Sequence, residues 1–159
     1  MKKYVLHAVA SLGLLASMAA APAHAQLVNA NDPAKIKAIV ESQGWPAKLI
    51  DEPGDDPYIE SSRNGMPFLI IFMNCTAGKQ CKTLQYYMGF TGAANVPLDR
   101  FNAWNREKRF ARAYLDEKGD PVLEMDVDLD FAGIPSRNVG ETFKTWASLM
   151  DSFQTFISE

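Results

Sequence analysis

Four carboxylates recur at every second position in the last third of the chain, and carboxylates supply both acid–base chemistry and cation ligands. They are Glu124, Asp126, Asp128 and Asp130. Apolar residues fill the intervening positions, so the alternation predicts a strand over 122–131 with the acids on one face. Three interpretations stay open: a solvated acidic face, pairing with basic residues of a neighbouring element, or a divalent-cation site.

A cluster of basic residues precedes this strand, with only Asp99 and Glu107 to oppose it. Its members are Arg100, Arg106, Lys108, Arg109 and Arg112. One interpretation is a solvated helix face with local ion pairs. The other is a docking patch for an anionic partner or an acidic peptide, made by Arg100, Arg106, Arg109 and Arg112. Two neighbouring asparagines, Asn102 and Asn105, are expected to bond to nearby backbone and fix the following strand.

The first 25 residues have the pattern of a secretory signal peptide. Lys2 and Lys3 precede an uncharged, mostly apolar run over 4–21, and Ala23-His24-Ala25 offers small residues at the two positions that a signal peptidase recognises. We therefore expect cleavage after Ala25 and a periplasmic or secreted protein with no stable membrane anchor. The alternative is a retained anchor, because the apolar run has about the length of a short membrane span.

The predicted mature chain, residues 26–159, has lost both histidines of the sequence with the leader. Ser-His-Asp and Cys-His catalysis, imidazole metal sites and histidine pH switches are therefore excluded for it. Cleavage also removes Lys2 and Lys3, so the number of basic residues falls from 16 to 14. Against 19 acidic residues this gives a net charge of −5, which does not suit the binding of nucleic acid. No cofactor is indicated.

The chain has two cysteines, Cys75 and Cys81, at the facing ends of two predicted strands. An exported chain meets an oxidising compartment, where such a pair forms a disulfide that closes the hairpin loop. The alternative is a redox pair. The C-x5-C spacing and the lack of a neighbouring group that would lower a thiol pKa favour the structural bond.

Hydrophobic periodicity predicts a helix, four strands, a helix, two strands and a final helix, after a flexible leader over 26–31. The predicted ranges after that leader are 32–44, 48–51, 58–62, 66–73, 82–90, 97–108, 110–115 and 122–131, followed by a last helix that begins at 138. Because hairpin connections dominate, we expect an α+β fold whose antiparallel sheet carries its helices on one face. The continuous apolar run over 66–73 is expected to be a central strand covered on both faces.

Two helices carry apolar faces that should meet the sheet. The helix over 97–108 is expected to turn Leu98, Phe101 and Trp104 inward. The last helix has an uninterrupted apolar seam, made by Val139, Phe143, Trp146, Met150, Phe153 and Ile157. This seam either packs on the sheet or, because it is broad, forms a dimer face or a peptide groove.

The chain resembles the YbjN-domain proteins of bacteria over nearly all of residues 32–159. The resemblance rests on Gly44-Trp45, on 72–75 with 81–85, and above all on 98–114 with its continuation through Gly119-Asp120-Pro121 to Asp126. It implies a single domain with a fold like that of type III secretion chaperones, and a general role as a sensory-transduction regulator. No activity or ligand comes with it.

The function expected from these observations is non-enzymatic binding of a protein or peptide, in a groove between the sheet and the last helix. The identity of the partner is not given by the sequence, and a homodimer stays open by analogy with the family. The alternative is an envelope cation-binding protein or a carboxylate-based enzyme that uses the face of Glu124, Asp126, Asp128 and Asp130.

The cysteine pair gives a first prediction. Mature protein that is denatured without reductant should show no free thiol in a colorimetric thiol assay, and two after reduction, because Cys75 and Cys81 are bonded to each other. Two free thiols before reduction would contradict the disulfide.

Overall fold

The computed structural model describes residues 26–92 and 96–158, so the predicted signal peptide lies outside the described residues. Its helices are α1 (Pro33–Ser42), α2 (Leu98–Glu107) and α3 (Ser136–Ser158). Its strands are β1 (Leu27–Val28), β2 (Ala47–Ile50), β3 (Tyr58–Arg63), β4 (Met66–Met73), β5 (Thr83–Gly89), β6 (Arg112–Leu115), β7 (Pro121–Asp128) and β8 (Ile134–Pro135). Among the described residues, none of the helices combines the length and the apolar character that a membrane crossing requires.

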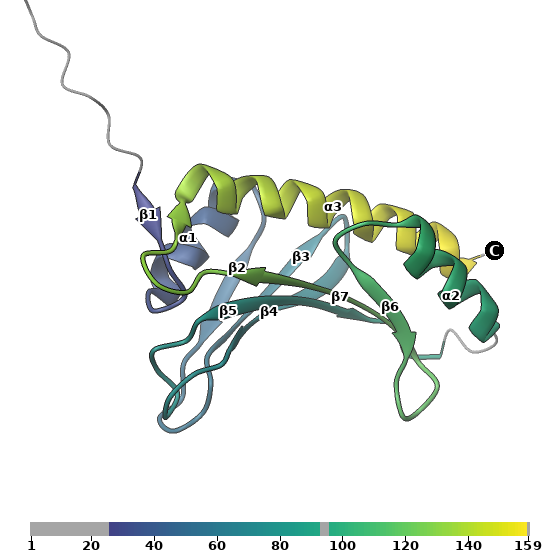
Figure 1. Cartoon of the computed structure of the whole chain (residues 1–159), viewed down its shortest axis with the longest axis horizontal. Coiled ribbons are helices and arrows are strands. Elements are labelled where there is room, and N and C mark those ends of the chain that lie inside the picture. The colour runs from purple at the N-terminus through teal and green to yellow at the C-terminus, as the bar shows by residue number, and fades with distance from the viewer. Residues whose placement is uncertain (1–25, 93–95, 159) are drawn as a thin grey trace, which may run out of the picture.

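A six-stranded sheet in the order β2-β3-β4-β5-β7-β6 forms the body of the protein, and every neighbouring pair is antiparallel. The long helix α3 crosses one face of this sheet, with α1 and α2 on the same side (Figure 1). The predicted α+β class and the one-sided placement of the helices are confirmed. The second, two-stranded sheet of β1 and β8 was not predicted, because each of its strands has only two residues.

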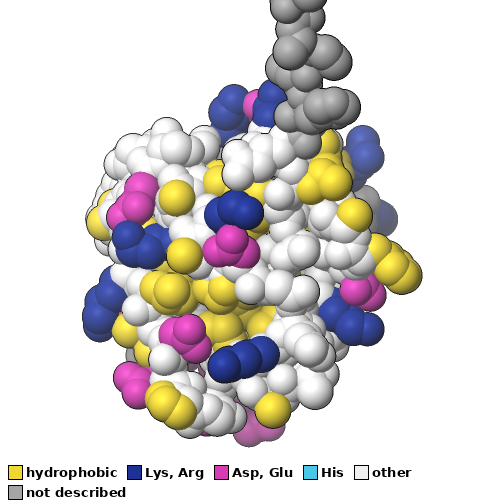
Figure 2. Space-filling model, turned by 90° about the vertical axis from the view of Figure 1, so that its left-hand side faces the viewer, with side chains coloured by type: hydrophobic (Ala, Val, Ile, Leu, Met, Phe, Trp, Pro, Cys, Tyr) yellow, Lys and Arg dark blue, Asp and Glu magenta, His cyan; other side chains and the backbone are white. Residues whose placement is uncertain are grey.

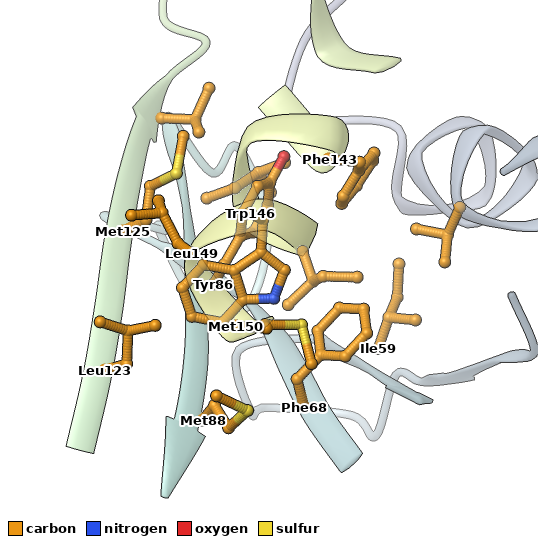
Figure 3. Close-up of a cluster of buried hydrophobic side chains, with 14 of the residues drawn as sticks. Ile59, Phe68, Tyr86, Met88, Leu123, Met125, Phe143, Trp146, Leu149 and Met150 are labelled. Atoms are coloured by element: carbon orange, nitrogen blue, oxygen red, sulfur yellow. The ribbon is translucent and has the colours of Figure 1, made fainter. Parts of the chain in front are cut away.

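The core lies between α3 and the inner face of the sheet. Trp146 is fully buried there, with its ring 5.8 Å from that of Tyr86 and 6.2 Å from that of Phe68. Figure 3 shows Trp146 lying among side chains of the sheet and of α3 itself. The seam residues Val139, Phe143, Met150 and Phe153 are fully buried as well. The seam therefore packs on the sheet, and the groove that was predicted between sheet and helix is filled by the core.

The central strand β4 is covered on one face only. Its inward side chains, including Phe68, Ile70 and Phe72, are buried, whereas those that point outward are partly exposed. The prediction that both faces would be covered was wrong. A continuous apolar run has no alternation that could tell the covered face from the uncovered one.

The segment 26–31, predicted to be a flexible leader, is fixed to the body of the protein. Its strand β1 pairs with β8, and Val28 and Ala30 are buried. A side chain at Gly133 would come within 2.1 Å of the Val28 carbonyl oxygen, so this close approach requires glycine. The signal for this contact is spread over two segments more than 100 residues apart, which local patterns cannot connect.

Predicted strand ends differ from the observed ones where the backbone turns. The strand expected over 110–115 begins at Arg112, because Phe110 adopts a left-handed φ of 74° that ends the extended geometry. The strand expected over 122–131 ends at Asp128, whose Oδ1 accepts a hydrogen bond from Asp130 N–H, and Phe131 has a φ of 57° in the turn that follows. In α2, Phe101 and Trp104 are buried as predicted, but Leu98 is 67% exposed because it occupies the first helical position.

The hairpin loop between β4 and β5 is closed by a disulfide between Cys75 and Cys81, as predicted. The loop packs closely on the segment before β3, because a side chain at Gly78 would come within 2.4 Å of the Asp55 carbonyl oxygen. The bond lowers the conformational entropy of the unfolded chain, which stabilises the fold by about 2–3 kcal/mol for a loop of this size.

Asn105 of α2 holds the outer edge of β6. Its Nδ2 donates to the Ala113 carbonyl oxygen at 2.9 Å, and the Ala113 N–H donates to Asn105 Oδ1 at 2.8 Å. The amide side chain thus takes the place that a further strand would occupy. The expectation that an asparagine of this helix fixes the following strand is confirmed for Asn105.

This clamp gives a second prediction. Asn105→Ala should lower the free energy of unfolding by about 1–3 kcal/mol, because it leaves the buried N–H and C=O of Ala113 without partners. Urea denaturation followed by circular dichroism measures the change. Asn102→Ala is the matched control, as Asn102 lies exposed on the same helix. Equal, small losses in both variants would contradict the clamp.

Candidate functional site

The outer face of the sheet, opposite α3, is covered by no element among residues 26–92 and 96–158 (Figure 1). Its middle is apolar. Leu69, Ile71 and Met73 point outward from β4 and are each partly exposed, and we call them the β4 strip. In the sheet register, Tyr58 of β3 lies opposite Ile71, and Tyr87 of β5 lies opposite Leu69. The strip therefore has one aromatic neighbour on each side, while Glu60 of β3 lies opposite Leu69 and Gln85 of β5 lies opposite Ile71.

A polar network borders the β4 strip on the side of β7. Glu124 is only 6% exposed, although it points to the outer face. The Tyr114 hydroxyl donates to its Oε1 at 2.6 Å, and Arg112 donates to its Oε2 from Nε at 2.8 Å. Arg112 also reaches Asp126 at 2.9 Å, and Gln85 donates to the other oxygen of Asp126 at 3.0 Å. Both oxygens of Glu124 are thus engaged.

The network shifts the pKa of its members in directions that follow from their surroundings. Burial raises the pKa of the Tyr114 phenol, and its hydrogen bond to Glu124 and the charge of that carboxylate raise it further. Burial likewise raises the pKa of Tyr87, helped by the negative charges of Asp116 and Glu124. For Arg112, burial works to lower the pKa, but hydrogen bonds and charges of Glu124 and Asp126 outweigh it and raise the pKa.

The four alternating acids do not form one solvated face. Glu124 is buried in the network, whereas Asp126 and Asp128 are exposed on the outer face. Asp130 lies beyond the end of β7, where its carboxylate is 3.6 Å from Lys82. Pairing with the basic cluster, one of the three interpretations, is confirmed for Arg112. In the part of the chain that the structure describes, no group of three or more His, Cys, Asp or Glu side chains could hold a metal ion.

The basic residues are dispersed over different surroundings. The Arg100 guanidinium donates to the Phe156 carbonyl oxygen at 2.8 Å and lies 4.8 Å from the centre of the Phe156 ring. Arg112 belongs to the network on β6 and β7. Arg106 and Arg109 are exposed at and after the end of α2. Arg112 is exposed as well, but its charge is paired with Glu124 and Asp126. The docking patch stays a prediction.

Two hollows were not predicted, because each joins segments that are distant in the sequence. One, of about 310 Å³, lies between α2 and the end of α3, and its lining includes Trp104, Lys108 and Phe156. The other, of about 400 Å³, lies beside the disulfide loop and is lined mainly by residues of that loop and of 30–33. Figure 2 shows this end of the molecule, with apolar side chains gathered in a hollow and charged ones around it.

Tyr114, Tyr87 and the β4 strip were not singled out as site residues. The two tyrosines belong to strands that were predicted, but nothing local in the sequence says that they meet Glu124. The exposure of the strip could be inferred only indirectly. If all the predicted helices pack on one face of the sheet, the other face has no helix to cover it.

The model of the YbjN family, described as "Putative bacterial sensory transduction regulator", matches residues 32–159. The match covers most of the sequence, so the chain belongs to this family, as the resemblance had indicated. The comparisons with curated proteins and with solved structures found no match. The likeness to type III secretion chaperones therefore stays a prediction.

The tyrosine network gives a third prediction. A raised pKa means that folded Tyr114 keeps its proton above pH 10, the ordinary value, so this stabilising contribution is complete below pH 10 and is lost as the pH rises further. Absorbance at 295 nm during alkaline titration should show Tyr114 ionising late. Glu124→Gln should move that ionisation to lower pH, because it removes the negative charge beside the phenol.

The assignment of the late step is checked by Tyr114→Phe, which should remove one late-ionising tyrosine and cost about 1 kcal/mol of unfolding free energy. Glu60→Gln is the matched control, since Glu60 is an exposed carboxylate on the same sheet face and pairs with Lys48. A titration that is the same in Glu124→Gln and Glu60→Gln would contradict the proposed cause.

Proposed function

We propose that this YbjN-family protein is exported and acts without catalysis, in a regulatory or chaperone-like role, by binding a protein partner on the outer face of its sheet. The observation that carries the proposal is the β4 strip. Leu69, Ile71 and Met73 are apolar, point away from the core and have no described element above them. A sheet face that is only solvated usually alternates toward polar residues, so an apolar centre favours a surface that a partner covers.

The surroundings of the strip fit a specific interface. Tyr58 and Tyr87 flank it, and tyrosine is enriched where proteins bind one another. The Glu124 network then provides a rigid polar border, because each of its charged groups is held by more than one hydrogen bond. An apolar centre with a polar border is the usual anatomy of a protein–protein interface.

A non-catalytic role is supported by the state of the carboxylates. Glu124, the buried acid, is engaged by Tyr114 and Arg112 on both oxygens, so its carboxylate already serves the structure of the sheet. Residues 26–159 contain no histidine, and the described residues bring no three potential metal ligands together. The membership in a family described as a regulator points the same way.

The fourth prediction tests this surface by photocrosslinking. Mature protein with p-benzoylphenylalanine in place of Ile71 should crosslink a discrete partner in a periplasmic extract, because Ile71 lies at the centre of the strip. The same group in place of Lys144 is the matched control, since Lys144 is exposed on α3, on the other side of the molecule. Mass spectrometry identifies the crosslinked protein.

The crosslink should disappear in a variant that also carries Leu69→Lys, while the circular dichroism spectrum stays unchanged. Leu69 is next to Ile71 on the same face, so a charge there should prevent apolar contact without touching the core. The same products from position 144, or crosslinks that survive Leu69→Lys, would refute the sheet face as the binding surface.

A further inference from the structure

The strand β7 is longer than its neighbour β6, and this leaves part of the sheet without an edge partner. β6 pairs with β7 only as far as Arg112 opposite Glu124, and the chain before Arg112 turns away at Phe110. The last four residues of β7, Met125–Asp128, therefore have β5 on one side and no described strand on the other. Figure 1 shows β7 running on past β6 with no strand beside it.

The backbone groups that face this open edge can be identified from the hydrogen bonds on the opposite side. Phe90 N–H donates to the Pro121 carbonyl oxygen, and Leu129 N–H donates to that of Lys82. The odd-numbered residues of β7 thus face β5. Since successive residues of an antiparallel strand direct their backbone groups to opposite sides, Asp126 and Asp128 direct theirs to the open edge. Both residues are exposed, and among the described residues no hydrogen bond engages these groups.

The side chains along the open edge specify which strand could pair there. Asp126 and Asp128 point to the outer face, and Asp128 has no ion-pair partner among the described residues. The residues on the inner face, Met125 and Val127, are apolar and nearly buried. A strand that pairs with this edge would therefore place basic side chains opposite the two aspartates and apolar side chains on the core side.

β6 already shows this arrangement in the pairing next to the open edge. Arg112 lies directly opposite Glu124, bonds to it at 2.6 Å and reaches diagonally to Asp126. Ala113, the next residue of β6, points inward and is buried. The sheet thus contains one basic-then-apolar repeat beside β7, and the open edge has room for its continuation.

We propose that the open edge of β7, Met125–Asp128, binds an extended segment of a partner protein that carries Lys or Arg at alternating positions with apolar residues between them. The inference rests on the proposed function only in assuming a protein partner, and it names the segment and a second contact surface. Main-chain pairing with Asp126 and Asp128 provides the affinity, and their carboxylates select for basic residues.

A second copy of the chain is a less suitable occupant of this edge, and the other two edges of the sheet are less suitable sites for a basic strand. A second copy of the chain that paired through the same edge would place Asp126 and Asp128 against like charges, which disfavours self-association. Asn105 occupies the outer edge of β6, so a strand cannot add there without displacing it. At the opposite end of the sheet, β2 presents a single lysine, Lys48, which already pairs with Glu60.

A turn beyond the end of β7 adds a contact for the bound segment. Phe131 is 94% exposed and adopts a left-handed φ of 57°, which is unfavourable for a phenylalanine. The turn is held by hydrogen bonds from Phe131 N–H to the Asp130 carboxylate and from Gly133 N–H to the Asp130 carbonyl oxygen. An exposed aromatic side chain in a turn that follows the open edge is suited to cover an apolar side chain of a docked strand.

The fifth prediction uses a defined probe, the peptide acetyl-Lys-Val-Lys-Val-Lys-Val-amide, and mature protein with its disulfide intact. In amide hydrogen exchange followed by nuclear magnetic resonance, the peptide should slow exchange at Asp126 and Asp128, because it supplies the missing carbonyl partners. The Glu-Val peptide of the same pattern and the Lys-Val peptide with N-methylated lysines should each bind at least about tenfold more weakly, since one reverses the charge and the other removes the N–H groups that face Asp126 and Asp128.

A pair of protein variants separates this edge from general electrostatic attraction. Asp126→Asn with Asp128→Asn should weaken binding of the Lys-Val peptide about tenfold. Asp55→Asn with Asp56→Asn, in the exposed segment before β3, makes the same change in net charge and should leave binding unchanged. Asp126→Asn also changes the contacts of Asp126 with Arg112 and Gln85. The single variant Asp128→Asn keeps these contacts and therefore tests the edge without that effect on the fold.

Protection at Asp126 and Asp128 that depends on both peptide charge and backbone N–H groups would support the edge. Equal binding to the two double variants, or protection at β2 instead of β7, would overturn it. The crosslinking test from Ile71 is independent, because it probes the β4 strip with natural partners. A failure of the peptide experiment therefore refutes the β7 edge alone, and a failure of the crosslinking experiment refutes the sheet face alone.

Discussion

The contact between α3 and the inner face of the sheet is the interaction on which the rest of the structure depends. One helix of 23 residues, about 35 Å long, covers strands that come from almost the whole chain. Its aromatic residues bridge the sheet, with Phe143 stacked on Tyr86 at 4.8 Å and Trp146 against Phe68. No other described element is long enough to bury that face. The other two helices are secondary contacts at its margins.

Because the helices all lie on one side, the outer face must be stabilised by the strands themselves. The chain achieves this in two ways. Toward β7, charged and aromatic side chains satisfy one another through the Glu124 network. In the middle, the β4 strip remains apolar and partly exposed. The groups of the Glu124 network satisfy one another's hydrogen bonds without a partner. The apolar area of the β4 strip is removed from water only when another molecule covers it. This difference separates the structural part of the face from the part available for binding.

The fold was largely predictable because its signals are local and strong. The seam of α3, the strand β5 and the disulfide hairpin each lie within one stretch of sequence, and all three are confirmed. The relations between stretches were not predictable. The β1–β8 pairing, the fork from Arg112 to two acids and the mismatch in length between β6 and β7 all depend on register, which one sequence does not reveal. The candidate surfaces consist of such relations.

The pairing of β1 with β8 has a consequence for the order in which the protein can fold. β1 is the first described strand, and its partner lies directly before α3, the last described helix. β1 therefore cannot pair until β8 has been synthesised, and the inner face of the sheet is uncovered until α3 has been synthesised. Such non-local contacts slow folding and keep apolar strands exposed in the incomplete chain.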